Sequence, residues 1–467
     1  MSPSITARRP VATIAFRQNQ AIRRLEMLPR AGAFVRPGHA NPQRETQACN
    51  FPPPVCAGRV QRSTQWTEFT ELATLFFIHG AAIGMWFVPL STVLDAHGLN
   101  AIKPYAFATS AMAAFVSPLI FGAMADRHAS PVMVLRGLAV ATAAAMTLAS
   151  TAIKLNWNPL LVLALIQLHA LCSAPTWGIS STIVFARLRD SKREFGPIRA
   201  MATLGWMTGC WLVSALNADG SPLAGYTGAV TWLVVAAFTF LLPTVAPPKS
   251  DEHLTLSQRL GLDALTLLKN HDHRVVFITA ALLNIPLAAF YPYTPTHLRT
   301  LGLDHTSAWM TLGQITEIIS MFALARLLTT WRLKWIFVVG LVFGVVRFAL
   351  CALDSKAWIL VGVTLHGCSF TLVFITAQIY VDERLDRAWR ARAQALLTLM
   401  LSGVGNLIGY LGTGWWFAAN SLPTGTQWPL FWGGLAAVVA GVLVYFLVAY
   451  HGIGRGLKRV KGNGVST

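Results

Sequence analysis

Long apolar segments recur along almost the whole chain, and they restrict it to a fold that can be buried in lipid. Each segment runs for about 18 to 25 residues, enough to cross roughly 30 Å of hydrocarbon as a helix. Only 12% of the 467 residues are charged, whereas soluble domains carry about 25%. The sequence therefore predicts an all-α, multi-pass integral membrane protein. Twelve transmembrane helices are expected, at residues 68–94, 103–125, 132–153, 158–186, 199–217, 223–244, 275–298, 306–328, 334–353, 357–381, 393–417 and 427–450.

Basic residues predict the orientation of these spans, because Lys and Arg are retained on the cytoplasmic side. With both termini inside, the outer loops contain only Lys103, Lys154, Arg299 and Lys356 of the 37 Lys and Arg residues. We therefore expect both termini in the cytoplasm, in a bacterial inner membrane. We interpret the net charge of +18 as a consequence of this topology and as a contact for anionic lipids of the bilayer. No nucleic-acid partner is expected.

Composition also divides the chain into parts. The segment 1–65 is rich in Arg and Pro and poor in acids, which predicts a disordered basic tail. The polar segment 247–274 is expected to be a cytoplasmic linker between two six-helix bundles, 66–246 and 275–450. A second basic tail, 451–467, follows the last span.

The two halves show a weak internal sequence repeat. Arg199-Ala200 opens the fifth span and Arg392-Ala393 opens the eleventh, and each pair follows a basic loop and precedes closely spaced glycines. Repeated halves with closely packed helices are typical of a carrier whose bundles rock about a site near the middle of the membrane. The sequence thus predicts two pseudo-symmetric bundles.

An acidic residue, Glu317, lies in the middle of the span 306–328, with Gln314 one turn before it. A carboxylate at bilayer depth costs several kcal/mol, so it faces a cavity or a partner rather than lipid. The structural alternative to a functional role is a buried ion pair with Arg347, which lies at a similar depth in the ninth span. Burial favours the neutral carboxyl group and a neighbouring Arg347 favours the charged one, so the protonation of Glu317 can change as a cavity opens.

The loop after the second span carries a recognisable motif. Residues Gly122 to His128 read G-A-M-A-D-R-H and resemble the signature of the major facilitator superfamily. The resemblance implies the major facilitator fold, and it implies that Gly122, Asp126 and Arg127 form a latch between conformational states. The match is partial, because Ala-Ser-Pro follows where the signature usually ends in Gly-Arg-Lys.

Longer stretches resemble the nucleoside:proton symporter family within that superfamily. They run in order from the first span to the last and leave the N-terminal tail uncovered. The resemblance implies a proton-coupled nucleoside importer that works by alternating access as a monomer, with a small-molecule substrate and a proton as partners and no cofactor. The matching stretches include Phe76-Phe77-Ile78, Pro197 to Trp206, Gly313 to Glu317, Arg347-Phe348, Gly367 to Phe370, Ala393-Gln394 and Gly403-Val404-Gly405.

The resemblance places much of a substrate pocket on two spans. Arg199, Thr203 and Trp206 are spaced i, i+4, i+7 and therefore share one helical face, as Gln314 and Glu317 do at i, i+3. A guanidinium, a hydroxyl and an indole on one stripe can meet a sugar hydroxyl and stack on a base. From the burial of Glu317 and the similar depth of Arg347, we also hypothesise that Glu317 carries or gates the coupled proton, with Arg347 as its alternate counter-ion. The alternative for the fifth span is that Arg199 anchors its cytoplasmic end and Trp206 is a core or interfacial residue.

The tenth span departs from the family. Its pocket positions read His366, Phe370 and Thr371, so the family's acidic residue is missing. Either Glu317 serves both substrate and proton, or His366 takes over protonation, or this member is not a nucleoside symporter in the strict sense. A lone membrane histidine can equally be a hydrogen-bonded packing residue.

The seventh span also departs from the family. Asn284 stands alone where the family has two amides, since Leu287 occupies the second position. Pro286, Pro292 and Pro295 are expected to interrupt this helix, and broken helices often border binding sites. Asn284 remains a candidate contact.

Other functional classes lack their motifs. The chain contains no HExxH, paired-carboxylate, Cys/His-cluster or Walker A pattern, so we expect neither an enzyme, nor a metal site, nor ATP-driven transport. Two alternatives stay open: a major facilitator permease for another small solute, such as a sugar or a drug, and a non-transporting membrane sensor.

Overall fold

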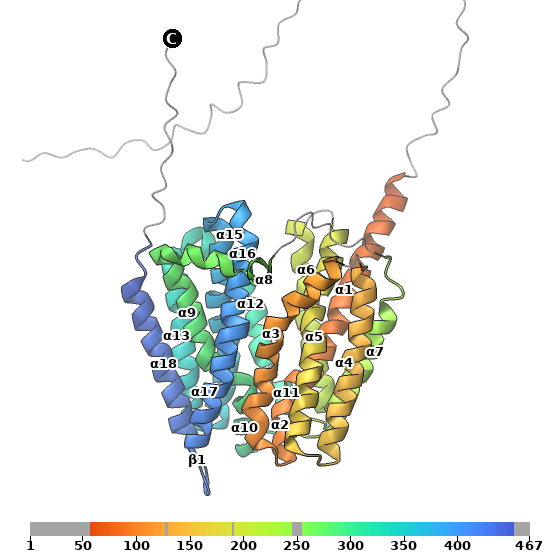
Figure 1. The fold of residues 1–467 in the computed structure, drawn as a ribbon. Coiled ribbons are helices and arrows are strands. Elements are labelled where there is room, and N and C mark those ends of the chain that lie inside the picture. Colours follow the sequence, from red (N-terminus) through yellow and green to blue (C-terminus); the bar gives the residue numbers. More distant parts are fainter. Residues whose placement is uncertain (1–56, 127–128, 189–190, 245–254, 453–467) are drawn as a thin grey trace, which may run out of the picture. The chain divides into compact units, whose positions relative to one another are not determined.

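The computed structural model describes most of the chain, and almost all of the described part is helical (Figure 1). Of the expected basic tails 1–65 and 451–467, residues 1–56 and 453–467 lie outside it. The described residues are 57–126, 129–188, 191–244 and 255–452.

The N-terminal half folds around its own apolar core, which includes Phe76, Leu135 and Trp232. Helices α4 and α5 begin with a proline in the first turn, where its fixed φ suits a helix and no N–H is needed. The side chain of Asn158 caps α5 by accepting the backbone N–H of Leu160 at 2.9 Å. The elements are α1 (Ala57–Phe87), α2 (Leu90–Ala96), the 3₁₀ turn η1 (Asn100–Ile102), α3 (Lys103–Asp126), α4 (Pro131–Lys154), α5 (Pro159–Arg187), α6 (Ser191–Ala215) and α7 (Leu223–Phe238).

The C-terminal half has a second core, which includes Phe290, Phe348 and Trp432. A short hairpin of β1 and β2 pairs Ser421 with Thr426 in an outer loop. The elements are α8 (Leu256–Arg259), the 3₁₀ segment η2 (Leu262–Lys269), α9 (His271–Leu287), α10 (Phe290–Thr300), α11 (Thr306–Met310), α12 (Leu312–Thr330), α13 (Leu333–Cys351), α14 (Lys356–Phe370), the π-helical turn η3 (Thr371–Ile375), α15 (Thr376–Arg384), α16 (Arg387–Thr398), the π-helical turn η4 (Leu399–Gly405), α17 (Asn406–Ala419), β1 (Ser421–Leu422), β2 (Gly425–Thr426) and α18 (Trp428–Ala449).

These helices agree with the twelve predicted spans. In the described ranges, nine helical stretches are long and apolar enough to cross a membrane, and α3, α6 and α7 occupy the three remaining predicted spans. The predicted break in the seventh span is confirmed at Pro286, because α9 ends one residue later, at Leu287, and α10 starts at Phe290. The expectation was wrong for Pro292 and Pro295, which lie within α10. Helix α1 begins at Ala57, earlier than the expected boundary at residue 66.

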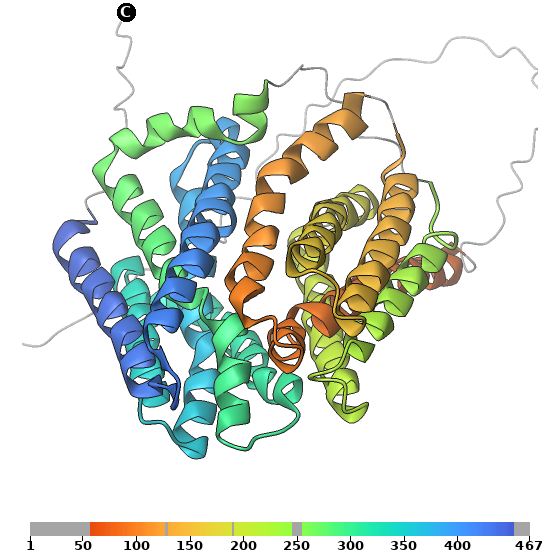
Figure 2. The ribbon, with the colours of Figure 1, turned by 60° about the horizontal axis from the view of Figure 1, so that its bottom comes forward.

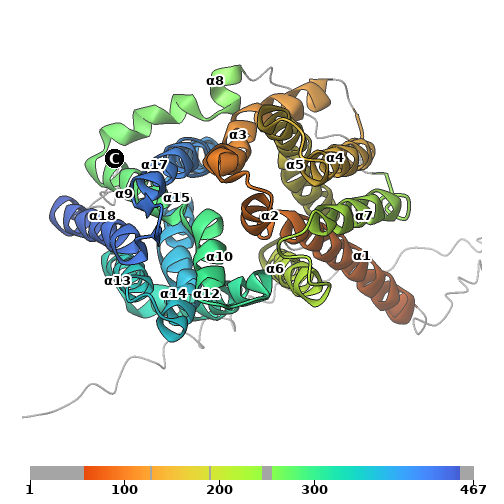
Figure 3. The same cartoon turned by 90° about the horizontal axis from the view of Figure 1, so that it is seen from below.

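The two bundles lie side by side (Figures 2 and 3). Helix α2 packs against α10, α3 against α17, and α6 against α11. In the predicted orientation these contacts join the outer ends of the bundles.

Glycines bring α1 and α6 into close contact inside the N-terminal bundle. A Cβ on Gly84 would lie 2.6 Å from the backbone oxygen of Trp206, and a Cβ on Gly209 would lie 2.5 Å from that of Ala81. No side chain fits at either position, so the two backbones can approach closely. This crossing sets the position of the α6 face that carries Trp206.

We expect Gly209→Val to force α1 and α6 apart and to destabilise the protein by about 1–3 kcal/mol, the usual cost of overpacking. Thermal unfolding of the detergent-purified protein measures the effect. Gly137→Val on α4 is the matched control, because a Cβ added there meets no atom within 4 Å. Equal melting temperatures for the two variants would contradict the close crossing.

Candidate substrate-binding site

A polar cavity of about 300 Å³ lies between the two bundles, and we call it the central cavity. Helices α1, α5 and α6 contribute its wall on the N-terminal side, and α10, α12 and α14 contribute the other side. Six residues predicted for the substrate pocket meet here: Arg199, Thr203, Trp206, Gln314, Glu317 and Phe370.

On α6, the predicted stripe faces the central cavity. The guanidinium of Arg199 lies over the ring of Trp177 at 4.6 Å from its centroid, and its Nη1 donates a long hydrogen bond of 3.5 Å to the hydroxyl of Thr203. Stacking on an indole holds the planar guanidinium in place and leaves further N–H groups free to bind an occupant.

On α12, close packing against α14 positions Glu317. A Cβ on Gly367 would lie 2.6 Å from the Cα of Glu317, so only glycine permits this approach. The hydroxyl of Thr316 also donates to the backbone oxygen of Thr364. One turn earlier, Gln314 donates from Nε2 to the hydroxyl of Tyr291 at 3.2 Å. The backbone that carries Glu317 is therefore packed closely against α14.

Arg199 and Glu317 are opposite charges on opposite walls of the central cavity. Their charges attract each other, although these two described residues form no direct ion pair. Opposite charges attract each other without direct contact in a site that is partly shielded from water. An occupant can therefore lie between the two charges and contact both.

Two buried polar atoms in the wall have no hydrogen-bond partner: Nε1 of Trp206 and Oε1 of Gln314. Buried polar groups in native proteins are nearly always paired, so each such orphan requires an explanation. A polar occupant of the central cavity would supply the missing partners.

Arg347 and His366 lie outside the cavity wall. The guanidinium of Arg347 is buried, donates from Nη1 to Nδ1 of His366, and lies 4.8 Å from the ring centroid of Phe290. Because an arginine only donates, Nδ1 accepts and the imidazole is neutral in this contact. The ring of His366 also stacks on Phe290 at 3.8 Å. The structure therefore does not contain the ion pair between Arg347 and Glu317 that was considered as the structural alternative.

Asn284 and Thr371 are also separate from the cavity. Asn284 donates from Nδ2 to the backbone oxygen of Leu401 at 2.8 Å and to Oδ1 of Asn406 at 2.6 Å. It therefore joins α9 to η4 and α17. Thr371 is fully buried and donates to the backbone oxygen of Glu317 at 3.4 Å. Thr371 therefore contacts the backbone of Glu317 and does not line the cavity.

The expected latch stays a prediction. Gly122 and Asp126 belong to the last turns of α3, and Arg127 lies outside the described residues.

Sequence reasoning missed two aromatic residues of the wall, Trp177 and Tyr291. Tyr291 could have been found, because it lies between Pro286 and Pro292 in the span whose interruption was predicted. Trp177 carries no comparable signal, since a tryptophan in an apolar helix is typical of packing.

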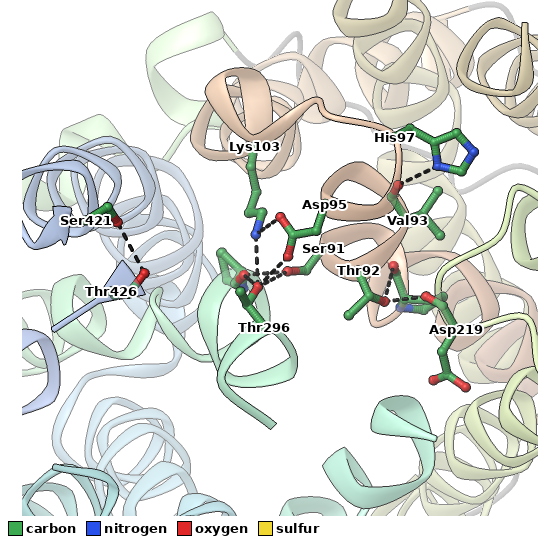
Figure 4. A network of polar contacts seen from close by, with 12 residues as sticks. Ser91, Thr92, Val93, Asp95, His97, Lys103, Asp219, Thr296, Ser421 and Thr426 are labelled. Carbon is green, nitrogen blue, oxygen red and sulfur yellow. Dashed lines mark hydrogen bonds and ion pairs between the residues drawn. The ribbon is translucent and has the colours of Figure 1, made fainter. Parts of the chain in front are cut away.

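A hydrogen-bond network closes the outer side between the bundles (Figure 4). Lys103 forms an ion pair with Asp95, and both contact Thr296 of α10: Lys103 donates to its hydroxyl at 2.9 Å, and that hydroxyl donates to Asp95 at 2.6 Å. Ser91 donates to the backbone oxygen of Pro292. We call these residues the outer lysine cluster.

Asp219 forms a second outer connection. It follows α6, and its carboxylate accepts the backbone N–H of Ser307 at 2.6 Å and the hydroxyl of Thr306 at 3.3 Å, both in α11. Its backbone oxygen accepts the hydroxyl of Thr92. Like the outer lysine cluster, Asp219 ties the N-terminal bundle to the C-terminal one.

The fold and the central cavity together define a class of protein. Two helical bundles that enclose a polar cavity and are joined by hydrogen bonds at their outer ends form a secondary transporter with the major facilitator fold. A solved structure shares this fold: a crystal structure of a mutant of the nucleoside transporter NupG aligns with a TM-score of 0.77 and 23% identity, over 82% of this chain and 100% of that chain.

Sequence comparison then identifies the family. The family model described as Nucleoside H+ symporter matches residues 67–452, so the chain belongs to the nucleoside:proton symporter family. YegT of Escherichia coli is 32% identical over 402 residues, which cover 82% of this chain and 93% of YegT. The nucleoside permease NupG of Escherichia coli is 25% identical over 406 residues, which cover 81% of this chain and 94% of NupG. Membership confirms the predicted family and the prediction that the protein is a transporter rather than an enzyme.

Proposed function

We propose that this chain imports nucleosides together with protons by alternating access, with the central cavity as its substrate site. The observation that carries the proposal is the pair of facing charges, Arg199 and Glu317, on the two bundles. A substrate held between them contacts both bundles, so its binding free energy can favour one arrangement of the bundles over another.

The polar groups of the central cavity suit a sugar. Arg199 and Nε1 of Trp206 donate hydrogen bonds, whereas Glu317 and Oε1 of Gln314 accept them. Ribose hydroxyls both donate and accept, so they can satisfy the two orphan atoms at once. Phe370 and Trp206 add aromatic surface next to these groups.

Glu317 is the proposed proton carrier. Protonation of Glu317 removes its attraction to Arg199 across the central cavity. The arrangement of the bundles that this attraction stabilises then becomes less favourable. Arg347 does not contact Glu317 in this state, so its proposed role as alternate counter-ion requires a different arrangement of the bundles. His366 and Thr371 are proposed to hold the wall in place rather than to touch substrate.

We also propose the membrane, the orientation and the oligomeric state of the protein. The bias of Lys and Arg supports an inner-membrane location with both termini in the cytoplasm. The two bundles already enclose the cavity within one chain, which supports a functional monomer. Gly122, Asp126 and Arg127 are proposed as the latch between conformational states.

Breaking the outer closure should favour the outward-open arrangement. Asp219→Ala removes the two carboxylate hydrogen bonds to α11, and we expect a shift in the population ratio of about 10-fold. Spin labels on cysteines introduced at Asn156 and Thr424, in a background without native cysteines, report the distance between the outer ends of the bundles.

The control is Asp354→Ala, because Asp354 is also an outer acid but bonds to His297 of its own bundle at 2.7 Å. It should leave the distance distribution unchanged. An unchanged distribution for Asp219→Ala as well would show that Asp219 does not hold the outer side closed.

Uptake by proteoliposomes tests the proposed function. The purified chain should accumulate labelled uridine when the vesicle interior is made more alkaline than the outside, and unlabelled ribonucleosides should compete. Accumulation of a sugar or a drug without competition by nucleosides would instead favour the permease alternative. Absence of any transport, with binding retained, would favour a sensor.

A further inference from the structure

A second cavity, of about 320 Å³, adjoins the central cavity. Ile83, Trp177 and Trp206 line both. Six Trp, Phe and Tyr side chains line it, and it has none of the charged residues that line the central cavity. We call it the aromatic chamber and define it by Trp86, Phe87, His169, Trp177, Trp206 and Tyr410.

His169 is a polar residue of the aromatic chamber that packing alone does not explain. It is 7% exposed, its Nε2 is buried without a partner, and its ring packs 5.4 Å from Trp86. His79, another buried histidine of this bundle, has both ring nitrogens satisfied by Thr176 at 3.0 Å and Ser180 at 3.2 Å. His79 is therefore explained by packing, whereas His169 is not.

Both bundles contribute to the aromatic chamber. Tyr410 of α17 packs against Phe107 of α3 with ring centroids 5.7 Å apart. Asn406, which also lines the chamber, is held by Asn284. An occupant therefore contacts the two parts that move in alternating access, and Asn284 acts on it through Asn406.

We propose that the aromatic chamber binds the planar heteroaromatic base of the nucleoside, and that His169 hydrogen-bonds to the polar edge of that base. The proposal rests on nucleoside transport as the proposed function. Aromatic side chains stack on any base, and a ring nitrogen adds the discrimination that stacking lacks. With the base in the aromatic chamber and Trp206 between the two spaces, the sugar lies in the central cavity beside Arg199 and Glu317.

Equilibrium binding to the purified full-length chain tests this orientation. The ligands are uridine, N3-methyluridine, which has a blocked base edge, and 2′-deoxyuridine, which has an altered sugar. The wild type should bind both analogues less tightly than uridine, by about 10-fold for the lost base hydrogen bond. His169→Phe should lose the preference for uridine over N3-methyluridine but keep the preference over 2′-deoxyuridine. His169→Gln, whose amide donates and accepts, should restore the base preference.

A filled chamber gives an independent readout. Ala170→Leu adds bulk beside His169 in the chamber wall and should weaken uridine binding by about 10-fold or more. Ala164→Leu adds the same bulk on the same helix at an exposed position and should bind uridine as the wild type does.

Unchanged base preference in His169→Phe, or uridine binding by Ala170→Leu that equals the wild type, would overturn the orientation while nucleoside binding itself stands. Failure of the wild type to bind any of the three ligands would overturn the proposed function instead.

Discussion

Glu317→Gln is expected to abolish the accumulation of nucleoside against its concentration gradient. Glutamine has nearly the same shape and still offers an acceptor oxygen, but it cannot take up or release a proton. Coupling between two ligands is typically worth about 1–3 kcal/mol, or roughly 5- to 150-fold in affinity. Without a titrating group across the central cavity from Arg199, that coupling disappears, and uptake by proteoliposomes with an imposed pH gradient should stop at equal concentrations inside and outside.

Exchange of labelled for unlabelled nucleoside should persist in Glu317→Gln, because exchange needs binding and alternating access but no net proton movement. Glu383→Gln is the matched control, since Glu383 lies exposed near the end of α15 and should keep full accumulation. If Glu317→Gln still concentrates nucleoside as the wild type does, another group carries the proton.

The helical spans and one face of the site could be predicted because they depend on local periodicity. Apolar length indicates a span, and a spacing of i, i+4, i+7 places Arg199, Thr203 and Trp206 on one stripe whatever surrounds it. The structure places all three on the wall of the central cavity. Pro286 likewise predicted the break between α9 and α10, whereas Pro292 and Pro295 are accommodated within α10.

Contacts between helices could not be predicted in the same way. Glu317 and Arg347 lie at similar depth in their spans, but depth is only one coordinate, and pairing also depends on helix rotation and on which helices are neighbours. In the structure Arg347 faces Phe290 and His366, while the charge acting on Glu317 is Arg199 from the other bundle. Asn284 shows the same limit, because its amide turns to Asn406 rather than to the cavity.

The missing acid of the tenth span also has a structural consequence. Thr371 occupies the position and donates its hydroxyl to the backbone of Glu317, so no second carboxylate repels Glu317 there. The attraction to Arg199 then acts on Glu317 alone. This arrangement favours the interpretation that one carboxylate serves both substrate and proton.

Arg199→Met is expected to weaken nucleoside binding by roughly 10- to 150-fold, the value of one or two hydrogen bonds from a charged donor. Methionine fills similar space over Trp177 but has neither charge nor N–H groups. Arg199→Lys keeps the charge and loses the planar stack on the indole, so its affinity should lie between the two. Equilibrium binding of uridine to the purified protein gives the comparison.

Arg136→Met is the matched control for this series. Arg136 belongs to the same bundle, lies over the ring of Phe240 at 3.6 Å and bonds to Thr239 at 2.9 Å, but does not line the central cavity. Its replacement removes an arginine stacked on an aromatic ring without touching the site, so uridine should bind with unchanged affinity. Equal losses for both arginines would mean that Arg199 acts through bundle stability rather than through the substrate.

Combining Arg199→Met with Glu317→Gln separates the attraction between these charges from their individual contacts with substrate. Residues that interact have effects that do not add, whereas independent residues have effects that add within about 0.5 kcal/mol. Because removal of Arg199 leaves Glu317 without its opposing charge, neutralising Glu317 as well should recover part of the affinity lost in Arg199→Met. Strict additivity in uridine binding would show that the two walls recognise the substrate separately, and proton uptake at Glu317 could then not be linked to substrate through Arg199.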